Sequence, residues 1–393
     1  MLYCALCLNR HQDTMKQQQH SLPNGEWHTQ APNLVESFNP AIVLALMSQY
    51  DNAHEALYEL VDNALDYSMG QKLQVRVDLL DSVIAVENIG GRGMGPEELA
   101  DFVSWGRQSK RDREAIGLYG QGAKSAAAYL GRGYRVLCKR AGCVQWYCIE
   151  DPDIIGKSAP RDFGVLKPLM PGLLPSDLKS VPESVGAVRI EILEPRSELA
   201  LAPETLRKEM GRVYGRCLGD GRVKLAVCGQ PVEPFDAPMD KDAVAIAQLC
   251  AEAKGLRMHG WCGKLDRDRC TGKPPEPGLA LFWRGRRIVE GTWFGMNRFQ
   301  KGSLASFYGE LTVEGCTPNL KKAAFIEQGS TNWANLGREI LRQAEPVLDA
   351  LRGTGDPQKI TQWDRRLART VQQELATTLQ EMLDREIVWD IGP

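Results

Sequence analysis

Glu59 and Asn63 are candidates for a metal-binding or catalytic site, because a carboxylate and an amide stand four positions apart in an otherwise apolar run. Residues 54–66 have the period of a helix, and positions four apart lie on one helix face. Such oxygen ligands suit Mg²⁺, and a carboxylate beside them can orient or deprotonate a water molecule. Two interpretations stay open here: a site with Asn63 as metal ligand and Glu59 as base, or an amphipathic helix with a polar seam.

Two glycine-rich segments further along favour the site. Residues 86–95 continue the β-branched run 83–86, which predicts a strand that runs into a tight turn. Residues 117–125 precede an alanine-rich stretch that favours a helix. Glycine lets backbone N–H groups approach phosphate oxygens, and a helix N-terminus attracts anions. The second segment is therefore a candidate phosphate loop, although it matches neither the dinucleotide fingerprint nor a P-loop.

The order of these motifs is more specific than any one of them. A helix with Glu-x-x-x-Asn, a strand with Gly-x-Gly-Met and then Gly-x-x-Gly-x-Gly-x-Lys resembles the GHKL ATPase superfamily of gyrase, MutL, heat-shock chaperones and histidine kinases. Residues 105–110 and 116–125 look most like the lid and phosphate loop of its MORC branch. The resemblance implies an α+β protein: a Bergerat-type α/β sandwich that binds ATP, a transducer-type α+β domain and a C-terminal helical tail.

The resemblance also implies roles for individual residues. Glu59 corresponds to the general base and Asn63 to the Mg²⁺ ligand. Residues 317–325 look like the MORC Pro-Thr-x-x-Lys-x-x-Phe segment, so Lys322, with Lys321 as the alternative, corresponds to the lysine that reaches the γ-phosphate; surface lysines in a turn are the other interpretation. The remaining expected ATP contacts are Asn88, Gly91, Gly93, Met94, Ser109, Lys110, Gly117, Leu118, Tyr119, Gly120, Gln121, Gly122, Ala123, Lys124 and Ser125.

Recognition of the base is where the sequence departs from the superfamily pattern. The glycine-methionine motif normally begins with an aspartate that accepts from the adenine amino group, assisted by a strand threonine. Ile89 stands at the aspartate position, or Asn88 if one glycine is inserted, and Ala187 replaces the threonine. ATP is still the expected nucleotide, because Asn88 can accept through its side-chain oxygen.

Four segments are expected along the chain: an N-terminal arm at 1–38, an ATP-binding domain at 39–198, a transducer-like α+β domain at 199–352 and an amphipathic helix at 353–393. The apolar stripe of the last helix packs either on its own second domain or on another subunit. Alternating hydrophobicity predicts strands, and a longer apolar period predicts helices. The expected strands include 73–79, 134–138, 144–149, 186–192, 225–227, 259–263, 279–283 and 309–313, and expected helices include 200–217 and 243–253.

The amino-acid composition limits which partners the protein can bind and where in the cell it is expected. A net charge of −2 gives no overall basic footprint, so contact with DNA rests on local patches, and the basic turn 284–287 is expected to be solvated. The eleven cysteines follow no regular frame, and no stretch reaches the roughly 20 apolar residues of a membrane span. We expect a cytoplasmic protein, or a nuclear one in a eukaryote, that is neither secreted nor membrane-bound. Cys4-x-x-Cys7 with two nearby histidines leaves zinc open against a loose arm.

The leading hypothesis is a Mg²⁺-dependent ATPase whose ATP binding closes a homodimer and whose slow hydrolysis opens it. Action on DNA or chromatin, or in genome defence, follows from family analogy alone. The alternatives are a nucleotide-gated scaffold without turnover, a histidine-type protein kinase and a chaperone. The kinase is disfavoured because His11, His20 and His28 lie in the polar arm rather than on paired amphipathic helices.

Overall fold

The computed structural model describes residues 45–66, 72–104, 122–156, 162–221, 223–295 and 304–353. The chain separates into the units Met1–Asn39 and Pro40–Pro393, and the described residues all belong to the second unit. The expected N-terminal arm and C-terminal helix, and the Cys4 and Cys7 pair, lie outside the described residues. None of the helices in the described ranges is long and apolar enough to cross a lipid bilayer.

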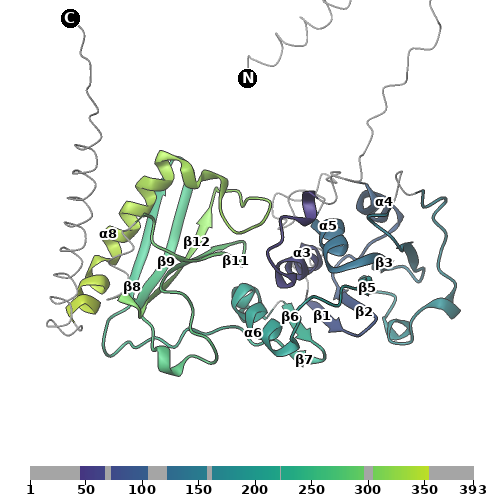
Figure 1. The fold of residues 1–393 in the computed structure, drawn as a ribbon, viewed down its shortest axis with the longest axis horizontal. Coiled ribbons are helices and arrows are strands. Elements are labelled where there is room, and N and C mark those ends of the chain that lie inside the picture. The colour runs from purple at the N-terminus through teal and green to yellow at the C-terminus, as the bar shows by residue number, and fades with distance from the viewer. Residues whose placement is uncertain are drawn as a thin grey trace, which may run out of the picture. The chain divides into compact units, whose positions relative to one another are not determined.

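The first sheet is mixed and has seven strands in the order β4-β3-β5-β2-β1-β6-β7 (Figure 1). Its neighbours pair antiparallel except β1 and β6, which are parallel. The strands are β1 (Leu73–Leu79), β2 (Val83–Gly90), β3 (Gly131–Lys139), β4 (Tyr147–Asp151), β5 (Ala187–Pro195), β6 (Val223–Val227) and β7 (Gln230–Pro231).

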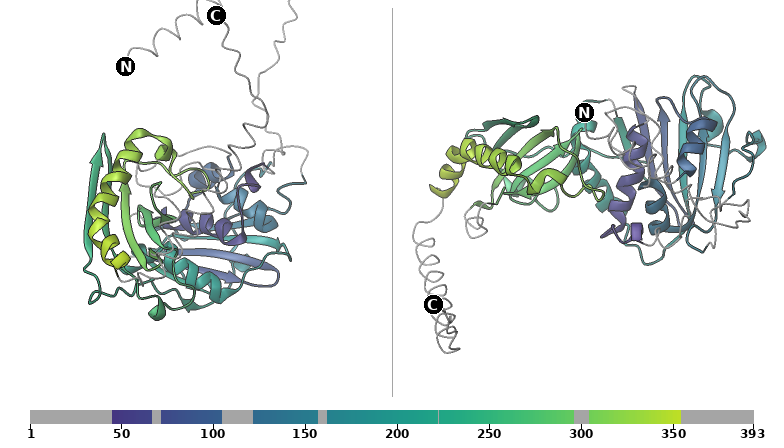
Figure 2. Two further views of the ribbon diagram at one scale, coloured as in Figure 1. Left: turned by 60° about the vertical axis from the view of Figure 1, so that its left-hand side comes forward. Right: turned by 90° about the horizontal axis from the view of Figure 1, so that it is seen from above.

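Helices α3 (Ala53–Asp66), α4 (Pro96–Val103) and α5 (Gly122–Leu130) pack on the apolar face of this sheet (Figure 2). The ring of Phe102 on α4 lies 5.8 Å from that of Tyr134 on β3. The opposite face carries ion pairs such as Arg135 with Glu191 and Arg76 with Glu87. This division follows from strand geometry, because successive side chains point to opposite faces of a sheet. The segment after β4 lies against the second face with two short 3₁₀ turns, η1 (Pro171–Leu173) and η2 (Leu178–Ser180).

Helices α6 (Pro203–Val213) and α7 (Gly215–Gly219) lead from β5 to β6. Leu206 and Met210 on α6 are fully buried, and α6 contacts both β6 of the first sheet and β11 of the second.

The second sheet has five strands in the order β11-β10-β12-β9-β8, with β10 and β12 parallel. Helix α8 (Thr331–Gly353) covers β8, β9 and β12 with its apolar side. The Gln343 side chain both donates to and accepts from the backbone of Cys250, at 2.8 Å each, and so covers the edge strand. The elements are β8 (Ala247–Ala253), β9 (Leu256–Lys264), η3 (Arg267–Arg269), β10 (Gly278–Trp283), β11 (Arg286–Thr292), β12 (Phe307–Glu314) and η6 (Ile326–Gly329).

The structure confirms an α+β class with mixed sheets and most of the expected elements, but three expectations differ. The helix expected at 243–253 is wrong: β8 occupies 247–253, where Leu249 and Ala251 are buried between exposed neighbours. Its alanines favour a helix, but pairing with β9 overrides that local preference. The strand expected at 225–227 in the second domain pairs instead with β1 of the first sheet. Helix α8 was not predicted.

Candidate functional site

Glu59 and Asp62 lie on the buried side of α3, with exposed fractions of 7% and 0%. The apolar positions Leu57, Leu60 and Val61 pack the helix down, so the two carboxylates are carried into the interior with it. Asn63 is half-buried, and its Nδ2 donates to the main-chain oxygen of Glu59 at 2.7 Å. That bond uses the donor side of the amide, which leaves Oδ1 as an acceptor or a metal ligand.

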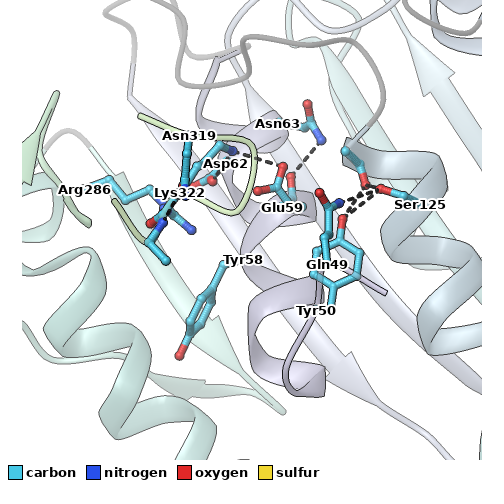
Figure 3. A network of polar contacts seen from close by, with 12 residues as sticks. Gln49, Tyr50, Tyr58, Glu59, Asp62, Asn63, Ser125, Arg286, Asn319 and Lys322 are labelled. Atoms are coloured by element: carbon cyan, nitrogen blue, oxygen red, sulfur yellow. Dashed lines mark hydrogen bonds and ion pairs between the residues drawn. The ribbon is translucent and has the colours of Figure 1, made fainter. Parts of the chain in front are cut away.

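Two cations from distant parts of the chain meet these carboxylates (Figure 3). The Nζ of Lys322 donates to Glu59 Oε2 at 3.0 Å and to Asp62 Oδ2 at 2.6 Å. The Nε of Arg286 lies 2.9 Å from Asp62 Oδ1. We call Glu59, Asp62, Arg286 and Lys322 the charge cluster; its two anions and two cations balance one another. Such a buried group is tolerated only because each charge has a partner.

The electrostatics of Lys322 are set by two opposing effects. Burial disfavours its ammonium form, but the carboxylates of Asp62 and Glu59 outweigh burial and hold the pKa of Lys322 above its usual value. Arg286 behaves alike: burial opposes its charge, and Asp62 raises the pKa of its guanidinium. Lys322 is therefore a permanent cation beside the candidate base.

The first turn of α5, which we call the cradle turn and define as residues 122–125, lies on the other side of Glu59 (Figure 3). A Cβ atom on Gly122 would lie 2.3 Å from Glu59 Oε2, so only glycine lets this carboxylate approach the helix N-terminus. The hydroxyls of Tyr50 and Ser125 are 2.8 Å apart, and both donate to the Gly122 carbonyl, at 3.2 and 3.1 Å. Gln49 Nε2 adds a bond of 3.3 Å to Ser125 Oγ.

Lys124 is a second buried cation in the cradle turn, with an exposed fraction of 3%. Burial lowers the pKa of its amine to about 7. An ammonium this close to neutrality gains charge when an anion binds beside it, because an opposite charge favours the ionised form. The cradle turn thus combines a helix N-terminus with a cation that an anionic ligand would stabilise.

The turn after β2 is held against β3. A Cβ on Gly93, whose φ is +67°, would lie 2.1 Å from the Lys139 carbonyl oxygen, so glycine is required there. Gly91 also has a positive φ, and Met94 is buried at 2%. These residues form a rigid turn at the end of β2.

Side-chain alternation along β2 separates the two candidates for base recognition. Ile89 and Ala187 pair across β2 and β5 and belong to one cluster with Leu174 and Leu178 on the face away from α3. Asn88 lies on the opposite face, the one that carries α3, α4 and α5. It is 3% exposed, and its Nδ2 has no hydrogen-bond partner within the described part of the chain.

The structure brings together Glu59, Asn63, Gly122, Ser125 and Lys322. Asn88 lies on β2, and Gly91, Gly93 and Met94 lie in the turn that follows this strand. Ala123 and Lys124 lie on α5, between Gly122 and Ser125. The expected lid and loop contacts Ser109, Lys110, Gly117, Leu118, Tyr119, Gly120 and Gln121 lie outside the described residues.

Sequence reasoning missed four contributors. They are Tyr50, Asp62, Arg286 and Tyr214, whose hydroxyl donates to Asp62 Oδ1 at 2.8 Å. The turn at 284–287 was expected to be solvated, and for Arg286 that is wrong, because it is 4% exposed and paired with Asp62. One signal was available: Asp62 stands three positions after Glu59 in an apolar helix, where an acid must find a partner.

A metal site built from protein side chains alone is not present in the described ranges, where no group of three or more His, Cys, Asp or Glu could hold an ion. Asn63 still fits Mg²⁺, because this ion keeps several waters and is often bound by one or two protein ligands together with substrate phosphates.

Known proteins share part of this sequence. The chain is 28% identical over 208 residues to the human MORC family CW-type zinc finger protein 1, which covers 49% of the chain and 20% of that protein. It is 32% identical over 118 residues to Protein MICRORCHIDIA 7 of Arabidopsis thaliana, covering 28% of the chain and 15% of that protein. The chain thus spans a fifth or less of these relatives, and no protein-family model matches it. The similarity is to MORC-family proteins, and it is distant.

Proposed function

We propose that this protein is a Mg²⁺-dependent ATPase of the MORC-like GHKL type. The observation that carries the proposal is the position of the Glu59 carboxylate, which contacts the N-terminus of α5 at Gly122 and the buried cation Lys322. A carboxylate between a helix N-terminus and a lysine suits a reaction in which a water attacks a phosphate. The partial likeness to MORC-family proteins supports the same activity.

In this mechanism the γ-phosphate of ATP lies against the cradle turn. Glu59 orients and deprotonates the attacking water, while Lys124 and Lys322 stabilise the charge that develops on the phosphate oxygens. Asn63 would hold Mg²⁺ through Oδ1, and the ion neutralises phosphate charge when it is bound. Lys322 bonds Glu59 in the described structure, so the base becomes available when the phosphate draws Lys322 away.

The wider activity belongs to the same proposal. Asn88 would read the base, since it lies on the helix-covered face of the sheet. Closure of a homodimer by ATP, its reopening after hydrolysis, and contact with DNA rest on the resemblance. A nucleotide-gated scaffold is the second candidate, and the ion pair between Lys322 and Glu59 favours it, because a base neutralised by a lysine turns over slowly or not at all.

Glu59→Gln tests the proposal. We expect the variant to bind ATP at least as tightly as the wild type, because it removes a negative charge from the cluster, and to lose turnover by roughly 100- to 10,000-fold, the usual contribution of a general base. Glu97→Gln, which removes an exposed carboxylate on α4, is the matched control and should keep full turnover. Binding is measured with a fluorescent ATP analogue and turnover by phosphate release, with Mg²⁺ or with EDTA.

Each outcome decides between the candidates. Unchanged turnover in Glu59→Gln excludes Glu59 as the base. A wild-type protein that binds ATP but does not hydrolyse it is a scaffold. A wild-type protein that does not bind ATP at all contradicts the proposal. Sedimentation with and without ATP and DNA, run on the same samples, tests the dimer and the DNA contact.

A further inference from the structure

Asp62 is the most heavily bonded carboxylate near the candidate site. Its Oδ1 accepts from the Tyr214 hydroxyl at 2.8 Å and lies 2.9 Å from Arg286 Nε, while its Oδ2 accepts from Lys322 at 2.6 Å. Tyr214 follows α6, Arg286 begins β11 and Lys322 lies in the turn before η6. Three separate elements that come after β5 in the chain therefore converge on one fully buried acid of α3.

The turn that presents Lys322 is itself built for a fixed geometry. Lys322 has a positive φ of 50°, and its N–H donates to the Asn319 carbonyl at 2.9 Å. The side-chain oxygen of Asn319 accepts from the Ala323 N–H at 3.0 Å. Arg286 Nη1 donates to the Lys322 carbonyl at 3.3 Å, so Arg286 touches both Asp62 and the backbone of this turn.

This geometry divides the cluster into two parts. Glu59 has Lys322 as its cation, whereas Asp62 has both Lys322 and Arg286. If Lys322 leaves Glu59 for a phosphate, Asp62 still holds Arg286 and Tyr214, and through Arg286 it still holds the turn. Asp62 is therefore placed to keep the lysine within reach of Glu59 without taking part in the reaction.

We propose that Asp62 is a positioning residue: with Arg286 it anchors the Lys322 turn to α3 and sets the net charge that the cluster presents to a nucleotide phosphate. The effect on nucleotide affinity rests on the proposed function, whereas the anchoring of the Lys322 turn does not. A role in setting the charge predicts that the change in ATP affinity depends on the sign of the charge that a substitution removes. A role in packing alone does not predict this dependence.

Opposite charge changes should shift nucleotide affinity in opposite directions. Asp62→Asn keeps the side-chain shape and leaves the cluster one positive charge in excess, so the Kd for ATP falls by about tenfold. Arg286→Met leaves one negative charge in excess, so the Kd rises by about tenfold. The double variant restores the balance and returns the Kd to within about threefold of the wild type, since sites in one ion cluster are coupled.

Measurement of kcat distinguishes an effect on the position of Lys322 from an effect on ATP affinity. In Asp62→Asn, Lys322 keeps Glu59 as its only carboxylate, so kcat falls even though ATP binds more tightly. A substitution that only damaged packing would weaken binding and lower kcat together. Asp240→Asn is the matched control, because it removes the partner of Lys264, 2.9 Å away, outside the cluster, and should leave both quantities unchanged.

A measurement without nucleotide tests the anchor itself. Hydrogen exchange of the full-length protein should show faster exchange in residues 317–325 for Asp62→Asn than for the wild type or Asp240→Asn. If Asp62→Asn fails to fold, recovery of a folded protein in the double variant supports the same charge balance, because an unpaired buried charge is what destabilises.

The outcomes keep the two proposals apart. Unchanged exchange in residues 317–325, or Kd values that move in the same direction in both single variants, overturns the role of Asp62. Failure of the double variant to recover overturns it as well. A wild-type protein that does not bind ATP contradicts the ATPase, and the exchange measurement then decides on Asp62 alone.

Discussion

The cradle turn and the charge cluster flank the same carboxylate, Glu59, but different forces hold them. The cradle turn is fixed by neutral hydrogen bonds from Tyr50 and Ser125 to the Gly122 carbonyl. The charge cluster is fixed by ion pairs from Lys322 and Arg286 to Asp62. Both regions contain a buried lysine, yet burial lowers the pKa of Lys124 to about 7, whereas carboxylates raise that of Lys322 above its usual value.

This contrast indicates that the cradle turn and the charge cluster have different roles around Glu59. Lys322 is already paired with Glu59 and Asp62, so it reaches a new anion only by giving up one of these partners. Lys124 carries a charge that burial opposes, so an anion bound at the cradle turn would stabilise it. We therefore expect the cradle turn to determine the strength of phosphate binding and the charge cluster to determine what happens to Glu59 afterwards.

Gly122→Ala should break this arrangement with the largest effect. The new Cβ would lie 2.3 Å from Glu59 Oε2, so the carboxylate must move away from the cradle turn. We expect turnover to fall by about 100-fold, a loss that a 1 Å misplacement at an active site can cause. The Tm should change little, because the end of a flexible side chain can shift at low cost. Unchanged turnover would mean that the base does not act from beside Gly122.

Lys124→Met should change how the free energy of unfolding depends on pH. The amine has a pKa of about 7 when folded and 10.5 in the unfolded reference, so the unfolded chain binds more protons between these values. The stability of the wild type therefore rises with pH across this window, by up to about 1.4 kcal/mol per unit, and the burial cost is fully present below pH 7. The variant lacks this rise and is the more stable protein at pH 7. Urea unfolding of both proteins from pH 6 to pH 10 measures the difference; parallel curves would contradict a lowered pKa.

The same substitution should weaken ATP binding, because it removes the cation of the cradle turn. For the wild type, affinity declines as pH rises above about 7, where Lys124 of the protein without nucleotide loses its proton. Titration of a fluorescent nucleotide at several pH values measures this decline, which should be absent in Lys124→Met.

Tyr50→Phe should have the smallest effect of the three. It removes the hydroxyl that bonds Gly122 and Ser125, and keeps the ring against Tyr129 at 5.4 Å. We expect a loss of about 1 kcal/mol in unfolding free energy, the usual net value of a hydrogen bond, and a modest rise in KM. Tyr147→Phe, whose hydroxyl bonds Gln145 at the surface, is the control. Equal effects of the two substitutions would show that Tyr50 does not support the cradle turn.

Sequence patterns were sufficient for the elements whose contacts are local. Periods of 3.6 and 2 residues predicted α3 and β1, and the β-branched run 83–86 predicted β2. The spacing of Glu59 and Asn63 predicted a shared helix face, and the 2.7 Å bond between Asn63 and the Glu59 carbonyl agrees with it. Gly122 also predicted an open helix N-terminus, because a phosphate loop needs one.

Long-range pairing decided the rest. The alanine-rich sequence of β8 predicts a helix, but its pairing with β9 makes it a strand. Strand β6 belongs to the first sheet because it pairs with the edge of β1 that β2 leaves open. Arg286 was predicted to be a solvated turn residue, because the sequence around it does not indicate a buried acid with which it would pair. Its partner, Asp62, lies on a helix near the other end of the described chain. Residue types and spacing identified the candidate chemical groups. Which charges are buried together became clear only in the folded protein, because desolvation and ion pairing depend on distance in space and not along the chain.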